Sequence, residues 1–538
     1  MRILIFHGYL LGGTGSNVYN ARLAEALVRL GYEVHLLSQD RHPDDHAFVD
    51  AYGDWDDGEL CVRPSRAGSD RPVRCTVYRP NIGGLLPVYV EDRYEQIEAR
   101  TFAACSDEEI SGYIEANVAA VRELVARARP QLALANHLVM GPVILARALR
   151  GQVPYVVKVH GSALEYTVKP HPERFLAPAR EGLAGARAIL VGSLHTATSL
   201  WDALGEEDLP ERTRLGPPGV DVERFAPRPR CAAAAGVRAL AARLRSSPQA
   251  GPQAGPSAFA RDERAAAAAL ERLDPERDLL VAFVGKLIVS KGVDLLLAAW
   301  PLVLEQVPRA RLVVVGFGAY RDALQRLIDA LAVGDMVQVR EIATAGRALE
   351  ALGQASTSDG AREADAQAHV PLRHLLAFLD GLAASARERY LAAARELGER
   401  VVLTGRLDHE ELAELLPACE ALVVPSTFPE AFGMVAAEAA ACGALPVSAA
   451  HSGLAEVSDA LAGAVPEVAA GWLSFPIDDF AVTALAERLI GWLQAHPAVR
   501  RDTRDGLVAT ARERWSWDGV ARGVITAARG ELDGLARP

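Results

Sequence analysis

The sequence predicts an α/β protein with two domains in series, each built on its own parallel β-sheet. Short apolar strands alternate with helical segments from residue 2 to about residue 226, the alternation stops in an alanine- and proline-rich stretch, and it restarts near residue 279. Strands that alternate with helices form parallel sheets covered by helices. The length of 538 residues also exceeds what one hydrophobic core normally supports.

The first domain is expected over residues 1–226. Arg2–His7 is a short apolar run that predicts the first strand, and Ser16–Leu30 has apolar residues at helical spacing and ends at Gly31. Glu33–Ser38 predicts the second strand. The alternation continues with a helix that opens at Asp107 and with strands over Leu132–Ala135, Tyr155–Val159 and Ala188–Gly192.

Two stretches interrupt the alternation. Residues 227–276 contain a PQAGPQAG repeat between alanine- and arginine-rich flanks, so we expect a partly disordered linker or insertion with helix-forming flanks. Residues 337–399 join a polar segment to leucine- and alanine-rich segments, which predicts a helical insertion. The second domain is then expected over 277–510. Residues 511–538 are amphipathic and predict a final helix that docks on the first domain.

Composition and charge restrict the partners and the compartment. The net charge of −12 argues against nucleic acid as a main partner, because phosphate backbones bind basic surfaces. The six cysteines are scattered without a CxxC pair, which argues against a disulfide scaffold or a zinc site and fits a reducing cytoplasm. The first apolar run is too short for a signal peptide, and we find no apolar run long enough to span a bilayer. We therefore expect a cytoplasmic protein, and peripheral membrane association stays open.

Three segments carry candidate chemistry, and the first is HGYLLGGTGSN at residues 7–17. Gly12 and Gly13 let the backbone approach a ligand closely, and the free N–H groups of the following helix attract an anion. A glycine-rich turn without a ligand is the plainer interpretation. A dinucleotide-binding loop is another, because Asp40 lies just past the second strand, although the loop lacks the last glycine of that fingerprint.

The second segment is FVGKLIVSKGVD at residues 283–294, where Lys286 and Lys291 flank a short loop after a predicted strand. Two cations at the carboxyl end of a strand suit a diphosphate leaving group, whose negative charge grows as its bond breaks. Two solvated lysines on a surface loop are the alternative, because lysine is usually exposed. The loop is thus a candidate diphosphate site.

The third segment is FPEAFGMVAAEAAACGALPV at residues 428–447. Glu430 precedes a helix that we expect to begin near Met434, and Glu438 lies roughly 7 Å along its axis at about 1.5 Å per residue. A sugar and a ribose joined through a diphosphate could bridge that distance. Glu430 would then accept hydrogen bonds from the sugar hydroxyls, and Glu438 would bind the ribose hydroxyls. The backbone N–H groups that would face the phosphates belong to Phe432, Gly433 and Met434. The alternative makes Glu430 a helix cap and Glu438 a surface residue.

In this order along the chain, the segments resemble the retaining GT-B glycosyltransferases of family 4, of the group 1 type. The Glu430-x7-Glu438 spacing, the lysine loop and the glycine-rich first loop carry the resemblance, together with GPPGVDVERFAP at residues 216–227 and VVLTGRLDHEEL at residues 401–412. It covers most of the chain outside the two interruptions. It implies two Rossmann-like domains that face each other across a cleft, and a C-terminal helix that crosses back to the first domain.

The resemblance implies a hexosyltransferase of glycan biosynthesis, which moves a sugar from a nucleotide-sugar donor to an acceptor hydroxyl and retains the anomeric configuration. Glu430 would contact the transferred sugar, Glu438 the ribose, and Lys286 and Lys291 the diphosphate. The family more often has arginine at the first lysine position, and lysine keeps the charge but loses the planar fork. The backbone groups that would meet the base belong to Gly405, Arg406 and Leu407.

On the first domain, the resemblance implies that His160 lies near the reacting sugar, whereas a core histidine is the alternative. Glu165 and Tyr166 are candidates on the acceptor side. The nucleotide sugar is a substrate, so no cofactor is expected, and the family usually needs no metal. The acceptor class, a sugar, a lipid-linked glycan or a small molecule, stays open.

Other functions are alternatives to transfer, and one motif resembles a metal site of other glycosyltransferases. The same fold supports epimerisation or hydrolysis of a nucleotide sugar, the first domain alone would suit an NAD-dependent oxidoreductase, and a non-catalytic sugar-nucleotide binder is a further alternative. The DWDD motif contains Asp54, Asp56 and Asp57, an Asp-x-Asp arrangement that holds a metal in other glycosyltransferase folds. No strand is expected before it, so we interpret it as a solvated loop.

Overall fold

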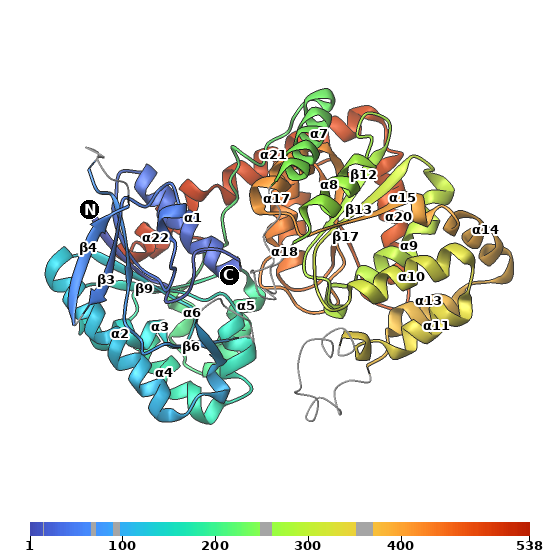
Figure 1. Cartoon of the computed structure of the whole chain (residues 1–538). Coiled ribbons are helices and arrows are strands. Elements are labelled where there is room, and N and C mark those ends of the chain that lie inside the picture. The colour runs from blue at the N-terminus through green and yellow to red at the C-terminus, as the bar shows by residue number, and fades with distance from the viewer. Residues whose placement is uncertain (14, 57, 66–71, 90–96, 248–260, 351–369) are drawn as a thin grey trace. The chain divides into compact units, whose positions relative to one another are not determined.

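The computed structural model describes residues 1–538 except 14, 57, 66–71, 90–96, 248–260 and 351–369. The described chain divides into two compact units (Figure 1). Unit 1 contains residues 1–219 and returns at residues 515–538. Unit 2 contains residues 220–247 and 261–514, apart from the gap at 351–369.

Unit 1 is built on a sheet whose described strands follow the order β11-β10-β9-β8-β1-β2-β5-β3-β4. All neighbours pair in parallel except β3 and β4, which form an antiparallel hairpin at one edge. The strands are β1 (Arg2–Phe6), β2 (Glu33–Leu37), β3 (Ala51–Asp56), β4 (Glu59–Pro64), β5 (Cys75–Arg79), β8 (Leu132–Asn136), β9 (Tyr155–Lys158), β10 (Ala188–Val191) and β11 (Thr213–Leu215). A separate parallel pair consists of β6 (Leu85–Val88) and β7 (Glu98–Thr101).

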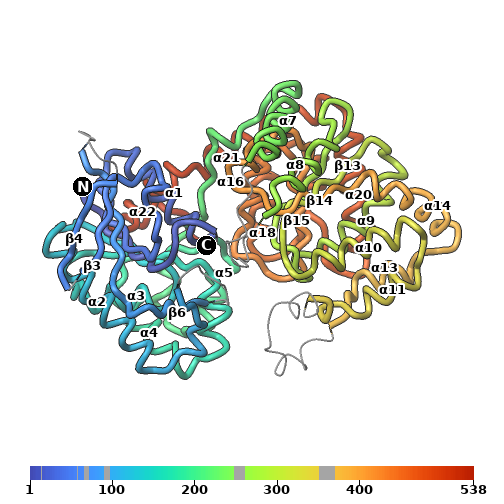
Figure 2. Tube along the Cα trace, viewed as in Figure 1, coloured from blue at the N-terminus to red at the C-terminus, as the bar shows by residue number. Residues whose placement is uncertain are grey.

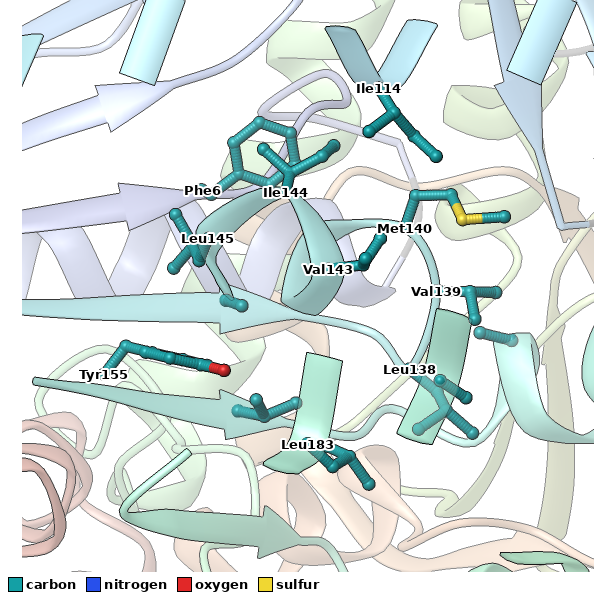
Figure 3. Packing of buried hydrophobic residues seen from close by; sticks show 14 of the residues in the cluster. Phe6, Ile114, Leu138, Val139, Met140, Val143, Ile144, Leu145, Tyr155 and Leu183 are labelled. Atoms are coloured by element: carbon teal, nitrogen blue, oxygen red, sulfur yellow. The ribbon is translucent and has the colours of Figure 1, made fainter. Parts of the chain in front are cut away.

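Helices of unit 1 cover both faces of this sheet. They are α1 (Gly15–Arg29), α2 (Asp107–Ala128), α3 (Gly141–Leu149), α4 (Pro172–Ala184), α5 (Leu194–Leu204), α6 (Leu209–Arg212) and α22 (Trp517–Arg529). Figure 3 shows part of one core, where side chains from β1, α2, α3 and α4 meet around Phe6, Ile114, Ile144 and Leu183. All four are buried, so this layer supplies much of the apolar burial that stabilises the unit.

The last long helix of the chain, α22, belongs to unit 1. It packs against α1 and against β8, β9 and β10, and Figure 1 shows it in red beside the blue α1. Its apolar side chains, including Trp517, Val520 and Ile525, join the core cluster on that face of the sheet. Trp517 also packs edge-on against Tyr19 of α1, with ring centroids 5.5 Å apart. The expected docking of a C-terminal helix on the first domain is confirmed.

Unit 2 is built on a second sheet with the strand order β14-β13-β12-β15-β16-β17, and its described strands all pair in parallel. The strands are β12 (Leu279–Val284), β13 (Ala310–Val315), β14 (Val401–Gly405), β15 (Cys419–Val424), β16 (Leu445–Ala449) and β17 (Ser474–Phe475). Its central strands are buried, as their apolar sequences require. Two units with parallel sheets and a returning C-terminal helix agree with the expected GT-B class.

Helices of unit 2 alternate with these strands. They are α9 (Val293–Gln306), α10 (Arg321–Val333), α16 (His409–Leu415), α17 (Met434–Ala441), α18 (Ser452–Ala462), α19 (Glu467–Ala470), α20 (Ala481–Leu493) and α21 (Pro497–Trp515). The described part of the helical insertion supplies four more, α11 (Met336–Ala345), α13 (Arg373–Gly381), α14 (Ala384–Ala394) and α15 (Leu397–Arg400). The insertion helices pack against α9, α10 and α20, so they extend one side of unit 2.

The stretch expected to be a linker, residues 227–276, forms two helices in its described parts. α7 (Arg230–Ser246) and α8 (Glu263–Glu271) pack side by side, as the tube in Figure 2 also shows, and they contact α16 and β14 of unit 2. Val237, Leu240 and Leu270 are buried there, because the alanine-rich flanks present an apolar face. The PQAGPQAG repeat lies outside the described residues.

The DWDD motif lies on a strand, and the expectation of a loop there is wrong. Asp54 and Asp56 belong to β3, which is extended because it pairs with β4 on one side and β5 on the other. Asp54 forms an ion pair of 2.8 Å with Arg79 of β5. Asp57 lies outside the described residues. A cross-strand ion pair is therefore the role that the structure shows for Asp54.

Candidate active site

The residues predicted to bind the donor gather at one edge of the unit 2 sheet. Lys286 follows β12, Glu430 follows β15, and Gly405 ends β14. These strands are close neighbours in the order β14-β13-β12-β15, and parallel strands end at the same edge. The carboxyl edge of such a sheet is where ligands of doubly wound folds bind. The topology thus brings together segments that lie more than 100 residues apart in the sequence.

The lysine loop is held tightly against the loop after β15. Val289–Lys291 forms one turn of 3₁₀ helix, and Gly292 closes it with a positive φ of 64°. A Cβ on Gly292 would lie 2.0 Å from the carbonyl oxygen of Pro425, so glycine is required for this close approach. The backbone N–H of Thr427 donates to the carbonyl of Ser290 at 2.9 Å. The two loops therefore form one backbone-linked platform.

Glu430 is the centre of this platform. Its Oε1 accepts a hydrogen bond of 2.6 Å from the Ser426 hydroxyl and forms an ion pair with Nζ of Lys291. Its backbone N–H donates to Oγ of Ser452 at 2.9 Å, and its carbonyl accepts from the N–H of Gly453 at 3.0 Å. Lys291 and Glu430 keep 30% and 23% of their side-chain surface exposed. The pair is fixed in place and still accessible to a ligand.

Glu438 lies inside α17, whose first residue is Met434 as expected, and it is almost fully buried. Its Oε1 accepts a hydrogen bond of 2.7 Å from Nε2 of His409, at the start of α16. A surface position for Glu438, which was the alternative, is therefore wrong. A buried carboxylate needs a hydrogen-bond partner, and His409 provides it.

The remaining predicted donor residues follow the same edge. Gly433 has a φ of 115° directly before α17, where its missing side chain leaves room for Leu454. Gly405 has a φ of 74° at the end of β14, and Arg406 forms an ion pair of 3.0 Å with Asp408. Leu407 and Phe432 are buried, whereas Gly405, Arg406, Gly433 and Met434 are partly exposed and Lys286 is exposed.

In unit 1, His160 belongs to a connected chain of amides and imidazoles. This amide–imidazole chain consists of His7, Asn17, Asn20, Asn136 and His160, which come from the ends of β1, β8 and β9 and from α1. His7, Asn17, Asn20 and Asn136 are buried, and His160 is partly exposed. Burial lowers the pKa of His7 to about 4 and holds the pKa of His160 well below its usual value. Both imidazoles are therefore neutral at physiological pH.

The glycine-rich first loop contacts the amide–imidazole chain, and the carboxylate of Asp40 binds the backbone of nearby loops. The Gly12 carbonyl accepts a hydrogen bond of 2.7 Å from the Asn17 amide, and Gly13 has a φ of 92°. Asp40 accepts from the backbone N–H of Leu11 at 2.8 Å and from that of His42 at 2.9 Å. Both carboxylate oxygens of Asp40 thus bind backbone, which does not fit the dinucleotide-binding alternative.

The two acceptor-side candidates lie on a π-helical turn over Leu164–Val168. Glu165 accepts hydrogen bonds from Lys169 and from the Ser199 hydroxyl, so its carboxylate is held by its own unit. Tyr166 has 51% of its surface exposed. A π-helical turn often occurs at functional sites, and Tyr166 is the more accessible of the two.

Sequence reasoning missed three side chains around Glu430. Ser426 binds the carboxylate of Glu430, and Ser452 accepts from its backbone N–H. His451 links the two serines, because it contacts the Ser452 hydroxyl and its Nε2 donates to the Ser426 carbonyl at 2.8 Å. Each is a polar residue shortly after an apolar strand, β15 or β16. That position was the available signal, because the carboxyl ends of parallel strands meet at one edge.

The described residues contain no group of three or more histidine, cysteine, aspartate or glutamate side chains placed to hold a metal ion. None of the described helices combines the length and the apolar character needed to cross a membrane.

The two units match two family models. The glycosyl transferase 4-like domain matches residues 14–206, in unit 1, and the glycosyl transferases group 1 model matches residues 270–344 and 375–505, in unit 2. The chain belongs to the group 1 glycosyltransferases. The break in the second match falls inside the helical insertion. Only residues 345–374 of that region are unmatched, and α14 and α15 lie within the matched part.

Relatives and solved structures agree with the family. The chain is 26% identical over 422 residues to the D-inositol 3-phosphate glycosyltransferase of Geodermatophilus obscurus, covering 76% of this chain and 73% of the relative. The protein of the same name from Frankia alni is 25% identical over 416 residues, covering 74% of each chain.

Among solved structures, sucrose-phosphate synthase from Thermosynechococcus elongatus superposes with a TM-score of 0.55 at 20% identity, covering 99% of both chains. Alr3699/HepE of Anabaena in complex with UDP-glucose superposes with a TM-score of 0.52 at 15% identity, covering 98% of this chain and 99% of that one. At these identities the likeness shows the GT-B fold of this glycosyltransferase. The family match removes the oxidoreductase alternative.

Proposed function

We propose that this glycosyltransferase moves a sugar from a nucleotide-sugar donor to an acceptor hydroxyl with retention of the anomeric configuration. The observation that carries the proposal is the contact between Lys291 and Glu430. The bond that breaks joins the sugar to the diphosphate, so the groups that hold its two sides must be adjacent. A cation for phosphate and a carboxylate for sugar hydroxyls meet there, at the ligand-binding edge of the sheet.

Donor binding exchanges one set of charged contacts for another. In this structure Lys291 and Glu430 form an ion pair with each other. With donor, Lys291 binds the diphosphate and Glu430 accepts hydrogen bonds from the sugar hydroxyls, while Ser426 continues to orient the carboxylate. Lys286 adds a second cation to the leaving group, whose charge grows in the transition state. Glu438 and the backbone near Gly405–Leu407 are proposed to hold the ribose and the base.

Retention is assigned to a front-side displacement in which the leaving phosphate accepts the acceptor's proton. A double displacement would need a carboxylate free to attack the anomeric carbon. The Ser426 hydroxyl continues to orient the Glu430 carboxylate when donor is bound, and that carboxylate is assigned to the sugar hydroxyls, which suits binding rather than attack. His160 is proposed to hydrogen-bond the transferred sugar from unit 1. The relatives' name makes D-inositol 3-phosphate one acceptor to test, beside sugars and lipid-linked glycans.

The test starts with a panel of nucleotide sugars and measures thermal stabilisation, because a ligand that binds only the folded state raises its stability. UDP-glucose is the first arm, and GDP-, ADP- and dTDP-hexoses follow. The stabilising donor then enters a transfer assay with the acceptor panel, and the anomeric configuration of the product is read by NMR. An inverted product contradicts retention. Donor hydrolysis that no acceptor changes indicates a hydrolase, and conversion of the donor sugar into its epimer indicates an epimerase.

The matched variants are Glu430→Gln and Glu467→Gln. The first should lose most transfer while the fold stays intact, because an amide only partly replaces charge-assisted hydrogen bonds to hydroxyls. Glu467, an exposed carboxylate at the start of α19, serves as the control. Near-normal turnover of Glu430→Gln at saturating donor would show that Glu430 only caps a helix.

A further inference from the structure

The amide–imidazole chain of unit 1 has a fixed direction, because four of its polar atoms contact backbone carbonyls. A carbonyl oxygen can only accept, so each side-chain nitrogen that contacts one must donate. His7 Nε2 contacts the carbonyl of Leu10 at 3.0 Å and therefore carries a proton. The NH₂ groups of the three asparagines contact the carbonyls of Gly12, Ser16 and Phe6 at 2.7, 2.9 and 3.3 Å.

These fixed donors determine every remaining bond. His7 Nε2 also contacts Asn17 Oδ1 at 2.9 Å, and because Nε2 is protonated in this neutral ring, Nδ1 carries the lone pair. Nδ1 accepts from the Asn20 amide at 3.0 Å. The Asn20 oxygen then accepts from the Asn136 amide at 2.6 Å. The Asn136 oxygen is left facing His160 Nε2 at 2.9 Å, and it can only accept.

We propose that Asn136 is a positioning residue that locks His160 in the Nε2–H tautomer, so that Nδ1 is presented as a hydrogen-bond acceptor. Asn136 cannot rotate its amide without placing its oxygen against the carbonyl of Phe6 and the oxygen of Asn20. His160 Nε2 must therefore be the donor of this bond. The lowered pKa of His160 leaves its ring neutral, which keeps the Nδ1 lone pair available.

The fixed tautomer determines what His160 can do with a substrate, and this conclusion rests on the proposed function. The members of the chain are amides and imidazoles, and none is a carboxylate that would stabilise an imidazolium. His160 is thus held as a neutral acceptor for a substrate hydroxyl rather than as a general base. Of the three neighbouring imidazoles His7, His137 and His160, only His160 is partly exposed, so it is the one that a ligand can reach.

The tautomer is measured directly by ¹⁵N NMR of the full chain labelled at histidine. The two ring nitrogens have different chemical shifts when protonated and when bare, and His160→Gln assigns the signal by its loss. We expect His160 with a protonated Nε2 and a bare Nδ1 at pH 7. A protonated Nδ1, or an imidazolium, would overturn the proposal whatever the enzyme does with substrates.

Variants separate positioning from simple loss of a buried amide. Asn136→Leu should shift the His160 signal toward a mixture of tautomers. It should also lower kcat on the order of tenfold and keep the donor affinity within about twofold of wild type. An interaction made mainly in the transition state affects kcat first. Asn117→Leu is the matched control, since Asn117 is buried in α2 and donates to the Tyr113 carbonyl at 2.8 Å.

The outcomes distinguish this proposal from the proposed function. An unchanged His160 signal in folded Asn136→Leu contradicts the positioning role. Equal kcat losses in Asn136→Leu and Asn117→Leu also contradict it, because the loss would then follow from any missing amide in the unit. The tautomer can be confirmed even if no nucleotide sugar is turned over, in which case the proposed function fails alone. If Asn136→Leu does not fold, the wild-type spectrum still decides.

Discussion

The Nζ of Lys291 and the Oε1 of Glu430 form an ion pair that joins the loop after β12 to the loop after β15. The two residues are 139 positions apart in the sequence. Their strands are neighbours in the sheet, with β12 paired to β15, so their loops leave the same edge. The pair therefore exists because of the strand order, and it combines the two charges that a sugar diphosphate requires.

Replacing Lys291 should weaken diphosphate binding and leave nucleoside binding nearly unchanged. We expect Lys291→Ala to lose on the order of tenfold or more in affinity for the nucleoside diphosphate, because a charge-assisted contact contributes roughly 1.5–3 kcal/mol. The nucleoside lacks the group that Lys291 binds. Calorimetric titration with both ligands measures the difference. Arg340→Ala, which removes an exposed cation paired with Asp380 elsewhere in unit 2, is the control. Equal weakening for nucleoside and nucleoside diphosphate would contradict this role.

The helical insertion should influence the lysine loop through Glu350. The carboxylate of Glu350 accepts a hydrogen bond from the backbone N–H of Val289, two residues before Lys291. Glu350→Ala removes this anchor, so we expect the KM for the donor to rise several-fold with a smaller change in kcat. Steady-state kinetics with varied donor gives both constants. Glu388→Ala, an exposed carboxylate on α14 of the same insertion, should leave them unchanged. The insertion has no such influence if both variants behave alike.

The stability of unit 1 should depend on pH through Lys158. This buried lysine donates to the carbonyl of Gly216 at 2.6 Å, and burial lowers its pKa to about 7. Between pH 7 and its ordinary pKa near 10.5, the unfolded chain binds a proton that the folded chain does not. The contribution of Lys158 to stability therefore rises with pH across that window, by up to about 1.4 kcal/mol per pH unit.

The measurement compares wild type with Lys158→Met in urea unfolding at pH 7, 8 and 9. Other groups titrate equally in both proteins, so the difference isolates Lys158. We expect Lys158→Met to have its greatest relative stability at pH 7 and to lose that advantage as pH rises. Parallel pH profiles would mean that Lys158 keeps an ordinary pKa in the folded protein.

The docking of α22 should depend on Trp517. Its ring packs edge-on against Tyr19 and lies against Gly219, where an added Cβ would be 2.5 Å from the indole. Trp517→Ala should cost about 3–5 kcal/mol of unfolding free energy, the usual range for a buried tryptophan. Gly219→Ala should also destabilise, because it inserts a methyl group into a filled space. Circular dichroism during urea unfolding measures both effects. A loss below about 1 kcal/mol for Trp517→Ala would show that α22 is held by its other contacts.

Most helices and strands could be predicted from the sequence, because apolar spacing and end residues lie within the element itself. Helix α1 covers Gly15–Arg29 where apolar spacing predicted Ser16–Leu30, and α2 begins at Asp107 as predicted. The start of α17 at Met434 follows from Gly433, whose φ of 115° ends the preceding loop. The strand β3 was missed, since DWDD has no apolar run, and its extended form comes from pairing with β4 and β5.

The sequence by itself determined two α/β units, their order along the chain, and the residue types of a donor site, because periodicity and strand-end motifs can be recognised within short windows. Tertiary structure alone decided which strand ends meet, which is why the Lys291–Glu430 pair, the roles of Ser426 and Ser452, and the burial of Glu438 against His409 could not be predicted. The same holds for the bond between Asn136 and His160. These contacts depend on strand order and on the direction of each donor, and neither is encoded in any single segment of the chain.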